Sequence, residues 1–260
     1  MEIRAPAKIN LNLSVTGKRD DGYHLLKSDI VFTAWGDDIT ITPADTLQFT
    51  VEGTYADVFD EMSVDRDSSN LIIKAVYLMA DRAGRDPNIH VHLIKNIPAG
   101  AGLAGGSSDA AAVMKALNEM WAMNLSLDEL CAMGLILGAE LPVCLHAPHA
   151  CHISGIGEII EPIQTEKYYL LIVWPDKTLV TKDVFARYQG EVHDDNDLTA
   201  AAMSLCPEIK SLIAQLNVCE GCQKAQMSGS GSACFGIFDT RQSAEMAAVN
   251  FKNTIVTETY

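Results

Sequence analysis

The feature that most constrains the fold is a glycine-rich segment, residues 97–109, with the sequence IPAGAGLAGGSSD. It follows a strand-like stretch at residues 88–94 and runs into an alanine-rich helical pattern at residues 108–121. Its four glycines free backbone N–H groups to converge on an anion. The helix behind adds unpaired amides and the positive end of its dipole. The segment therefore predicts a loop that holds polyphosphate at the start of a helix.

Other known phosphate loops fit this segment less well. Gly100, Gly102 and Gly105 satisfy the dinucleotide fingerprint GxGxxG literally. That fingerprint needs an acidic residue after a following parallel strand, but Glu119, at about that distance, lies inside the expected helix. The lysine of a Walker A loop is absent, and so are the protein-kinase signatures HRD and DFG. A phosphate loop of another kinase class remains, with a glycine-rich turn that binds nothing as the alternative.

The composition agrees with a folded chain and argues against several partners. Of the 260 residues, 48% are hydrophobic and 20% charged, which excludes wholesale disorder and predicts one large or two modest domains. The net charge of −15 argues against nucleic acid or an anionic membrane as a partner, although a local basic pocket can still hold a small anion. The longest apolar run, residues 168–174, is too short to span a bilayer, and no secretory signal is recognisable, so we expect a cytoplasmic protein.

The cysteines and clustered histidines give weak signals. Seven cysteines at irregular spacing in a chain of this size predict reduced thiols rather than a disulfide framework. Cys219 and Cys222 form a lone CxxC, for which two ordinary thiols near a turn are favoured over a zinc or redox pair. His146, His149 and His152 have a spacing that a metal can use, but a loop fixes no ligand geometry, so we treat them as structural or surface residues.

The N-terminal residues 7–15 alternate between apolar and polar side chains, which predicts a half-buried strand. Its polar face begins with Lys8 and Asn10. An ammonium beside amides is unusual for a face that is merely solvated. This face is therefore a candidate for chemistry, with a surface lysine as the alternative.

The remaining patterns mix strands and helices, with no internal repeat and no linker. Ser126 opens one helix through a capping box, and Gly138 is placed to end it. From residue 168 the order is strand, helices, strand, turn, strand, helix, strand, which is compatible with a ferredoxin-like split βαβ unit. We therefore expect an α+β fold with two domains, residues 1–155 and 156–260. Further strands are expected at residues 27–33, 38–42, 46–51, 168–174, 223–227, 233–238 and 254–258, and further helices at residues 70–82, 181–188, 199–217 and 241–251.

Three segments resemble the GHMP small-molecule kinases, and together they span nearly the whole chain. The first is APAKINLNL at residues 5–13, followed by GKRDDGYHL at residues 17–25. The second is the glycine-rich loop, residues 98–108, with DAAA directly behind it. The third is MSGSGS at residues 227–232, which leads into CFGIF. PAKIN together with DGYH is far more selective than any glycine motif, because it separates one kinase of this family from the others.

The resemblance implies an α/β sandwich in two parts. An N-terminal domain similar to ribosomal protein S5 domain 2 holds ATP, and a ferredoxin-like domain follows. The implied reaction transfers the γ-phosphoryl group of ATP to the 2-hydroxyl of a cytidine-diphosphate-linked methylerythritol, in non-mevalonate isoprenoid precursor synthesis. Mg²⁺ is implied as the ion that travels with ATP, held by phosphate oxygens and by Ser108.

The resemblance also implies roles for particular residues. Lys8 of PAKIN faces the transferring phosphoryl group, and Glu140 of LGAELP stands where the family has its aspartate base. Asn10, Tyr23 and His24 contact the substrate, with core packing as the alternative for the two rings. We expect Phe185, on the helix at residues 181–188, either to close the other side of the base or to lie in the core. The expected ATP phosphate-binding residues are Pro98, Ala99, Gly100, Ala101, Gly102, Leu103, Ala104, Gly105, Gly106, Ser107 and Ser108.

Two departures from the family pattern leave the activity open. Glu140 keeps the charge of the usual aspartate but is one methylene longer, and about 1 Å of misplacement can cost about 10²-fold in rate. Ala104 stands where the family usually has glycine, and its Cβ is costly only if its φ is positive. The alternatives to an active kinase of this kind are a catalytically weakened nucleotide-binding relative and a GHMP kinase for another alcohol.

Overall fold

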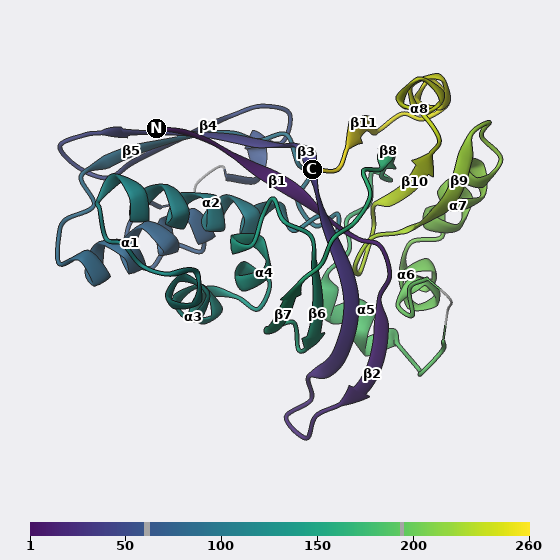
Figure 1. Ribbon diagram of the computed structural model, residues 1–260, viewed down its shortest axis with the longest axis horizontal. Helices are drawn as coiled ribbons and strands as arrows, with labels where there is room; N and C mark the ends of the chain where they lie inside the picture. The colour runs from purple at the N-terminus through teal and green to yellow at the C-terminus, as the bar shows by residue number, and fades with distance from the viewer. Residues whose placement is uncertain (60–62, 193–194) are drawn as a thin grey trace. The chain divides into compact units, whose positions relative to one another are not determined.

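The computed structural model describes residues 1–59, 63–192 and 195–260 and confirms the expected α+β fold (Figure 1). Its packing divides the chain into two compact units. The first unit comprises Met1–Ala7, Gly36–Ala99 and Ala104–Ala147. The second unit comprises Lys8–Trp35, Gly100–Leu103 and Pro148–Tyr260. No helix in the described ranges is long and apolar enough to cross a membrane.

This packing does not follow one cut near residue 155. Residues 8–35 and 100–103 precede that point, yet they pack with the C-terminal residues. The reason is that the long strand β3 (His24–Pro43) pairs in both units: its end pairs with β5 (Ile89–Ile94), and its start pairs with β6 (Cys151–Gly155). The assignment of residues 1–155 and 156–260 to two family domains stays a prediction.

The first unit places helices against a sheet in which β5 is the strand expected at residues 88–94. Along β5, every second side chain is buried, beginning with Ile89. In this unit β5 pairs antiparallel with the end of β3 and parallel with β4 (Gln48–Glu52). The helices α1 to α4 gather on one side of these strands (Figure 1), and α2 packs against both α1 and α4. The helices are η1 (Ala56–Phe59), α1 (Leu71–Ala83), α2 (Gly105–Met120), α3 (Leu127–Leu137) and α4 (Leu141–Leu145).

Local capping signals explain where these helices begin and end. The side chain of Asn70 accepts from the N–H of Ile72 and starts α1. Ser126 and Glu129 form the predicted capping box of α3, and Gly138 ends that helix. The helix α2 begins at Gly105, three residues earlier than its apolar stripe indicated, because the glycines and serines before the stripe also adopt helical backbone.

The second unit contains a four-stranded antiparallel sheet in the order β11-β8-β10-β9. In chain order this is 4-1-3-2, the split βαβ arrangement that the sequence predicted. The helix α7 packs against β9 and β10, and α8 packs against β8 and β11. The elements are β8 (Tyr169–Val173), α5 (Thr181–Arg187), α6 (Thr199–Leu205), α7 (Glu208–Asn217), β9 (Cys222–Met227), β10 (Cys234–Phe238), α8 (Arg241–Ala248) and β11 (Thr254–Glu258).

Two strand predictions differ from the structure. The expected strands at residues 27–33 and 38–42 are one strand, β3, because Gly36 makes a close approach rather than a turn: a Cβ there would lie 2.2 Å from the carbonyl oxygen of Ala5. The expected strand at residues 7–15 is two strands, β1 (Glu2–Asn10) and β2 (Ser14–Lys18). Between them Leu11 donates its N–H to the Asp29 carbonyl. The pair β6 and β7 (Ile159–Pro162) was not predicted.

Candidate active site

The phosphate loop, residues 98–108, leaves its backbone N–H groups available. Its tip, residues 100–103, belongs to the second unit, and its remaining residues belong to the first. Gly100 and Gly102 have positive φ angles of 66° and 77°, as a glycine loop allows. Among the described residues, the backbone N–H groups of residues 100–107 donate to no acceptor. Free backbone N–H groups of a glycine-rich loop and the positive end of a helix dipole are features that bind phosphate in proteins.

The carbonyl groups of the tip, in contrast, are engaged within the second unit. The carbonyl of Gly100 accepts from Leu179, and that of Ala101 accepts from Ala233 at 2.9 Å. The carbonyl of Leu103 accepts from the N–H of Lys8 at 3.0 Å. A tip whose carbonyls are bound to protein leaves its N–H groups for a ligand. The bond from Lys8 also ties the tip to the strand that carries the predicted catalytic lysine.

Gly102 is required by packing as well as by its φ angle. A Cβ at Gly102 would lie 2.7 Å from the carbonyl oxygens of both Ser228 and Gly231. These two residues belong to the serine-glycine loop, residues 227–232, whose three serines are buried. The serine-glycine loop therefore supports the phosphate loop by direct backbone contact.

Asn196 positions the serine-glycine loop, and sequence reasoning missed it. Its amide donates to the carbonyls of Met227 at 3.1 Å and Gly229 at 2.8 Å, and its carbonyl oxygen accepts from Leu198. The side chain is buried, so each of these bonds replaces lost hydration. The available signal was an asparagine shortly before a helix, which is typical of capping residues. A capping signal in the sequence does not show that the same side chain also binds the serine-glycine loop.

Ala104 has the unfavourable one of the two conformations considered from the sequence. Its backbone is left-handed, with φ 55° and ψ 27°, at the N-cap position of α2. A Cβ in this region costs about 1–2 kcal/mol. The side chain of Ala104 also supplies no capping hydrogen bond. The loop is therefore strained at the residue where the helix begins.

Asn10 and Lys8, at the end of β1, are both buried, so Lys8 is not a surface lysine. The N–H of Asn10 donates to Ser228 Oγ at 3.2 Å, and its Nδ2 donates to Ser28 Oγ at 2.7 Å. Its Oδ1 is buried and has no hydrogen-bond partner in the described part of the chain. The side chain of Gln226 holds this turn of chain through the carbonyls of Asn10 and Leu11. Asn10 thus keeps one acceptor for a ligand.

Glu140 lies at the N-cap of α4 in the first unit, and its side chain is exposed. Its carbonyl accepts from Cys144, and Pro142 fixes the first turn of the helix. Lys8 is the first residue of the second unit. A short helix with a proline in its first turn gives Glu140 a defined backbone.

Aromatic rings gather around His24 in the second unit. His24 stacks on Phe185, with ring centroids 5.0 Å apart, and meets Tyr188 edge-on. Tyr23, next to it, is 59% exposed. Burial and, after it, the charge of Lys18 lower the pKa of His24, so its ring is neutral near pH 7. A neutral imidazole can both donate and accept a hydrogen bond. Tyr188 was not predicted.

The two serines of the phosphate loop differ in access. Ser108 is buried, and its hydroxyl donates to the carbonyl of Pro6 at 2.7 Å. Ser107 is only half-buried. By exposure, Ser107 is the serine that suits a metal ion bound with phosphates, whereas Ser108 fastens α2 to β1.

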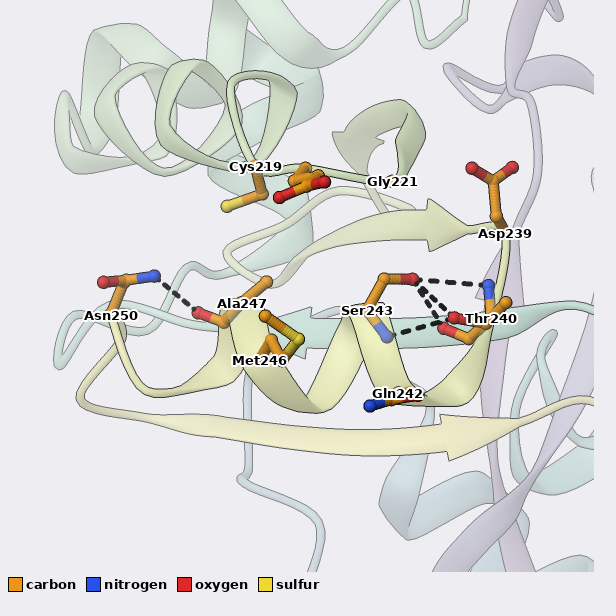
Figure 2. A pocket seen from close by; sticks show the side chains of 10 residues that line it. Cys219, Gly221, Asp239, Thr240, Gln242, Ser243, Met246, Ala247 and Asn250 are labelled. Carbon is orange, nitrogen blue, oxygen red and sulfur yellow. Dashed lines mark hydrogen bonds between the residues drawn. The ribbon is translucent and has the colours of Figure 1, made fainter.

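The CxxC thiols of Cys219 and Cys222, and a cavity beside Cys219, lie outside the predicted site residues. All seven cysteines are free, and burial raises the pKa of both Cys219 and Cys222. A cavity of about 600 Å³ lies beside Cys219 (Figure 2). Its hydroxyl groups, on Thr240 and Ser243, are already used to cap α8. It contains none of the predicted site residues. Among the described residues, no group of three or more histidine, cysteine, aspartate and glutamate side chains could hold a metal.

Two family models match the chain. The model described as GHMP kinases N terminal domain matches residues 70–147, and the model described as GHMP kinases C terminal matches residues 183–255. Together they cover more than half of the chain. With this fold and this phosphate loop, the chain belongs to the GHMP kinase family of ATP-dependent small-molecule kinases.

Its relatives give a narrower assignment. A Brucella abortus biovar 1 (strain 9-941) protein named 4-diphosphocytidyl-2-C-methyl-D-erythritol kinase is 40% identical, over 94% of this chain and 88% of the relative. A protein of the same name from Paramagnetospirillum magneticum (strain ATCC 700264 / AMB-1) is 36% identical, over 95% and 92%. A crystal structure of 4-(cytidine 5'-diphospho)-2C-methyl-D-erythritol kinase has a TM-score of 0.85 at 29% identity and covers 100% of this chain and 99% of its own. Mevalonate kinase from Methanococcus jannaschii shares the fold, with a TM-score of 0.70 at 13% identity.

Proposed function

We propose that this chain transfers the γ-phosphoryl group of ATP to the 2-hydroxyl of 4-diphosphocytidyl-2-C-methyl-D-erythritol, in non-mevalonate isoprenoid precursor synthesis. The names of relatives that match nearly the whole chain support the substrate. The observation that carries the proposal is the row of unpaired amides at residues 100–107, which suits a triphosphate. Phosphoryl transfer needs mainly positioning and charge neutralisation, and these amides supply both.

Lys8 and Glu140 have the catalytic roles in this proposal. The ammonium of Lys8 stabilises charge on the transferring phosphoryl group and on the acceptor oxygen. Glu140 accepts the proton of the attacking hydroxyl as that oxygen bonds to phosphorus and ADP leaves. The fixed start of α4 supports this role, because it holds the backbone of the longer acid in place.

The cytosine end of the substrate binds at His24 and Tyr23. The rings of His24 and Phe185 already touch, so a base does not fit between them. We place the base against the exposed ring of Tyr23 and the edge of His24, with Phe185 supporting His24 from behind. Asn10 offers its unpaired Oδ1 to a hydroxyl of the methylerythritol.

Mg²⁺ enters with ATP in this proposal, and Ser107 is the residue of the loop that would hold it. When bound, the ion neutralises phosphate charge. Ser108 is buried against Pro6, and its hydroxyl instead supports the helix that binds the phosphates.

The test measures ADP release by the purified protein with ATP and Mg²⁺, with and without the cytidine-diphosphate-linked substrate. We expect release that depends on the substrate, and we expect Lys8→Met to remove it. The strained Ala104 favours one second candidate, a weakened relative that binds its ligands without turnover. Binding of both ligands without ADP release would support that candidate, and turnover with another alcohol would replace the proposed substrate.

A further inference from the structure

Three buried charged side chains lie together beneath the start of α2 in the first unit. Lys95 comes directly after β5, and its side chain is 3% exposed, while those of Asp37 and Asp109 are 0% exposed. The ammonium of Lys95 contacts Asp37 Oδ2, and it donates to Asp109 Oδ2 at 2.9 Å. Buried charges of this kind are retained only when they are paired. We call these three residues the charged cluster.

The charged cluster holds the chain that leads into the phosphate loop. Asp37 Oδ1 accepts from the backbone N–H groups of Asn96 at 2.6 Å and Ile97 at 2.7 Å. These residues immediately precede Pro98, the first residue of the loop. The backbone of Lys95 is fixed as well, since its N–H donates to the Glu52 carbonyl at 2.7 Å.

The same cluster holds the chain that leaves the loop. Asp109 lies one turn into α2. A Cβ at Gly105, the first residue of that helix, would stand 2.9 Å from the ammonium of Lys95. Lys95 therefore joins one carboxylate that binds the backbone before the loop to another that is part of the helix after it.

The cluster contains one cation and two carboxyl groups, which bears on how its parts can be replaced. Burial raises the pKa of Asp109 well above its ordinary value. The Lys95 ammonium lowers this pKa, and the Asp37 carboxylate raises it further. When Asp109 is protonated, the charged cluster contains one ammonium, on Lys95, and one carboxylate, on Asp37, so its net charge is zero. An asparagine has nearly the same shape and the same lack of charge.

We propose that Lys95, Asp37 and Asp109 are positioning residues that set the distance between the two ends of the phosphate loop and so hold its amides for the phosphates of ATP. This proposal rests on the proposed kinase function. A loop whose ends drift apart presents the same amides with poorer convergence, so binding of ATP weakens first.

The test compares two neutral replacements of similar size, Asp109→Asn and Asp109→Leu. Asparagine can still accept from Lys95, whereas leucine cannot. We expect Asp109→Leu to raise both the KM and the Kd for ATP about tenfold or more, while the KM for the second substrate changes less than twofold. We expect Asp109→Asn to stay within about threefold of the parent. The surface variant Asp81→Asn, which removes a carboxylate that pairs with Arg66, serves as the control.

A merely structural role predicts a different result: Asp109→Leu would unfold at a lower temperature with an unchanged KM and Kd for ATP, and that result overturns the proposal. If Asp109→Leu does not fold, the double variant Lys95→Met/Asp37→Asn removes the paired charges together, and replacing a buried ion pair as a whole is often tolerated. The double variant must also bind ATP at least about tenfold more weakly, and parent-like binding overturns the proposal.

Hydrogen exchange at residues 97–106 separates this proposal from the proposed function. Faster exchange of these amides in Asp109→Leu, but not in Asp109→Asn or Asp81→Asn, supports the positioning role whether or not the parent turns over substrate. Unchanged exchange overturns it. Failure of the parent to consume ATP refutes the kinase function without changing this readout.

Discussion

The two parts of the phosphate loop are held by different chemistry. Its ends, in the first unit, are held by the buried charges of Lys95, Asp37 and Asp109. Its tip, in the second unit, is held through its own carbonyl groups, which accept from backbone N–H groups. The close approach of Gly102 to the serine-glycine loop also holds it. A neutral group of the right shape can replace a charge, but no side chain fits where two backbones touch. The tip should therefore tolerate less change than the ends.

The largest expected effect separates binding by the loop from the chemical step. In Glu140→Gln the side chain keeps its length but loses its basicity, so kcat should fall about 10²–10⁴-fold. The KM for ATP should change little, because Glu140 lies outside the loop. Steady-state kinetics with both substrates varied measures the two quantities.

Glu140→Asp is the matched variant for this prediction. It keeps the carboxylate and shortens the side chain by one methylene, so activity should remain well above that of Glu140→Gln. If both variants have the parent's kcat, Glu140 is not the base.

Gly102→Ala tests the tip directly. The new Cβ meets two carbonyl oxygens at 2.7 Å, so the tip must move, and a displacement of about 1 Å can cost about 10²-fold in kcat/KM. This loss should exceed that of Asp109→Asn at the ends. If Gly102→Ala is the milder of the two, the proposed difference between tip and ends is wrong.

Gly84→Ala is the control for backbone strain alone. Gly84 has a φ of 62°, close to that of Gly102, but a Cβ there meets nothing within 4 Å. Gly84→Ala should lower stability by about 1–2 kcal/mol without changing the KM for ATP. The difference between the two alanine variants then measures the contact with the serine-glycine loop.

The sequence predicted the elements that have strong periodicity and the site residues that lie in motifs. The strand β5 and the capping box of Ser126 depend on local sequence, and both predictions were confirmed. The order of elements was compatible with a split βαβ unit, and the 4-1-3-2 sheet has that arrangement. Roles carried over by motif, such as those of Lys8 and Glu140, remain predictions.

The supporting residues could not be predicted, because their partners are far apart in the chain. Asp37 and Lys95 are separated by 58 positions, and Asn196 and Gly229 by 33. A lone lysine after a strand has a surface position as its default interpretation. The strands at residues 27–33 and 38–42 were expected to be separate for a similar reason, since the close approach of Gly36 to Ala5 depends on tertiary packing. The strain at Ala104 could not be predicted either, because it depends on the φ angle of this residue, which the sequence does not give.

One predicted substrate contact of the second unit, His24, is neutral near pH 7, and pH tests its role. His24 has a lowered pKa and is neutral in the folded protein near pH 7. Acidification protonates the ring and removes its acceptor, so the KM for the cytidine substrate should rise several-fold below about pH 6, with the KM for ATP unchanged. His24→Gln should have a raised KM that no longer depends on pH in this range.

The same shift affects stability in a defined direction. The unfolded chain binds the proton near the usual pKa of about 6.5, before the folded protein does. His24 therefore lowers stability as the pH falls below that value and has no effect well above it. A midpoint of urea unfolding that falls less with acidification in His24→Gln than in the parent checks the sign, and an equal fall in both would contradict it.

The smallest expected effect is a gain, at the residue where tip and ends meet. Ala104→Gly removes a Cβ from a backbone with φ 55°, which relieves about 1–2 kcal/mol, while the freer unfolded glycine takes back part of this. The melting temperature should rise by about 2 °C, measured by circular dichroism. The KM for ATP should fall a few-fold, because α2 can then begin without strain beside the phosphates. A higher melting temperature with an unchanged KM would show that the strain of Ala104 affects only the stability of the helix. The ends of the phosphate loop would then set the binding geometry of the loop independently of Ala104.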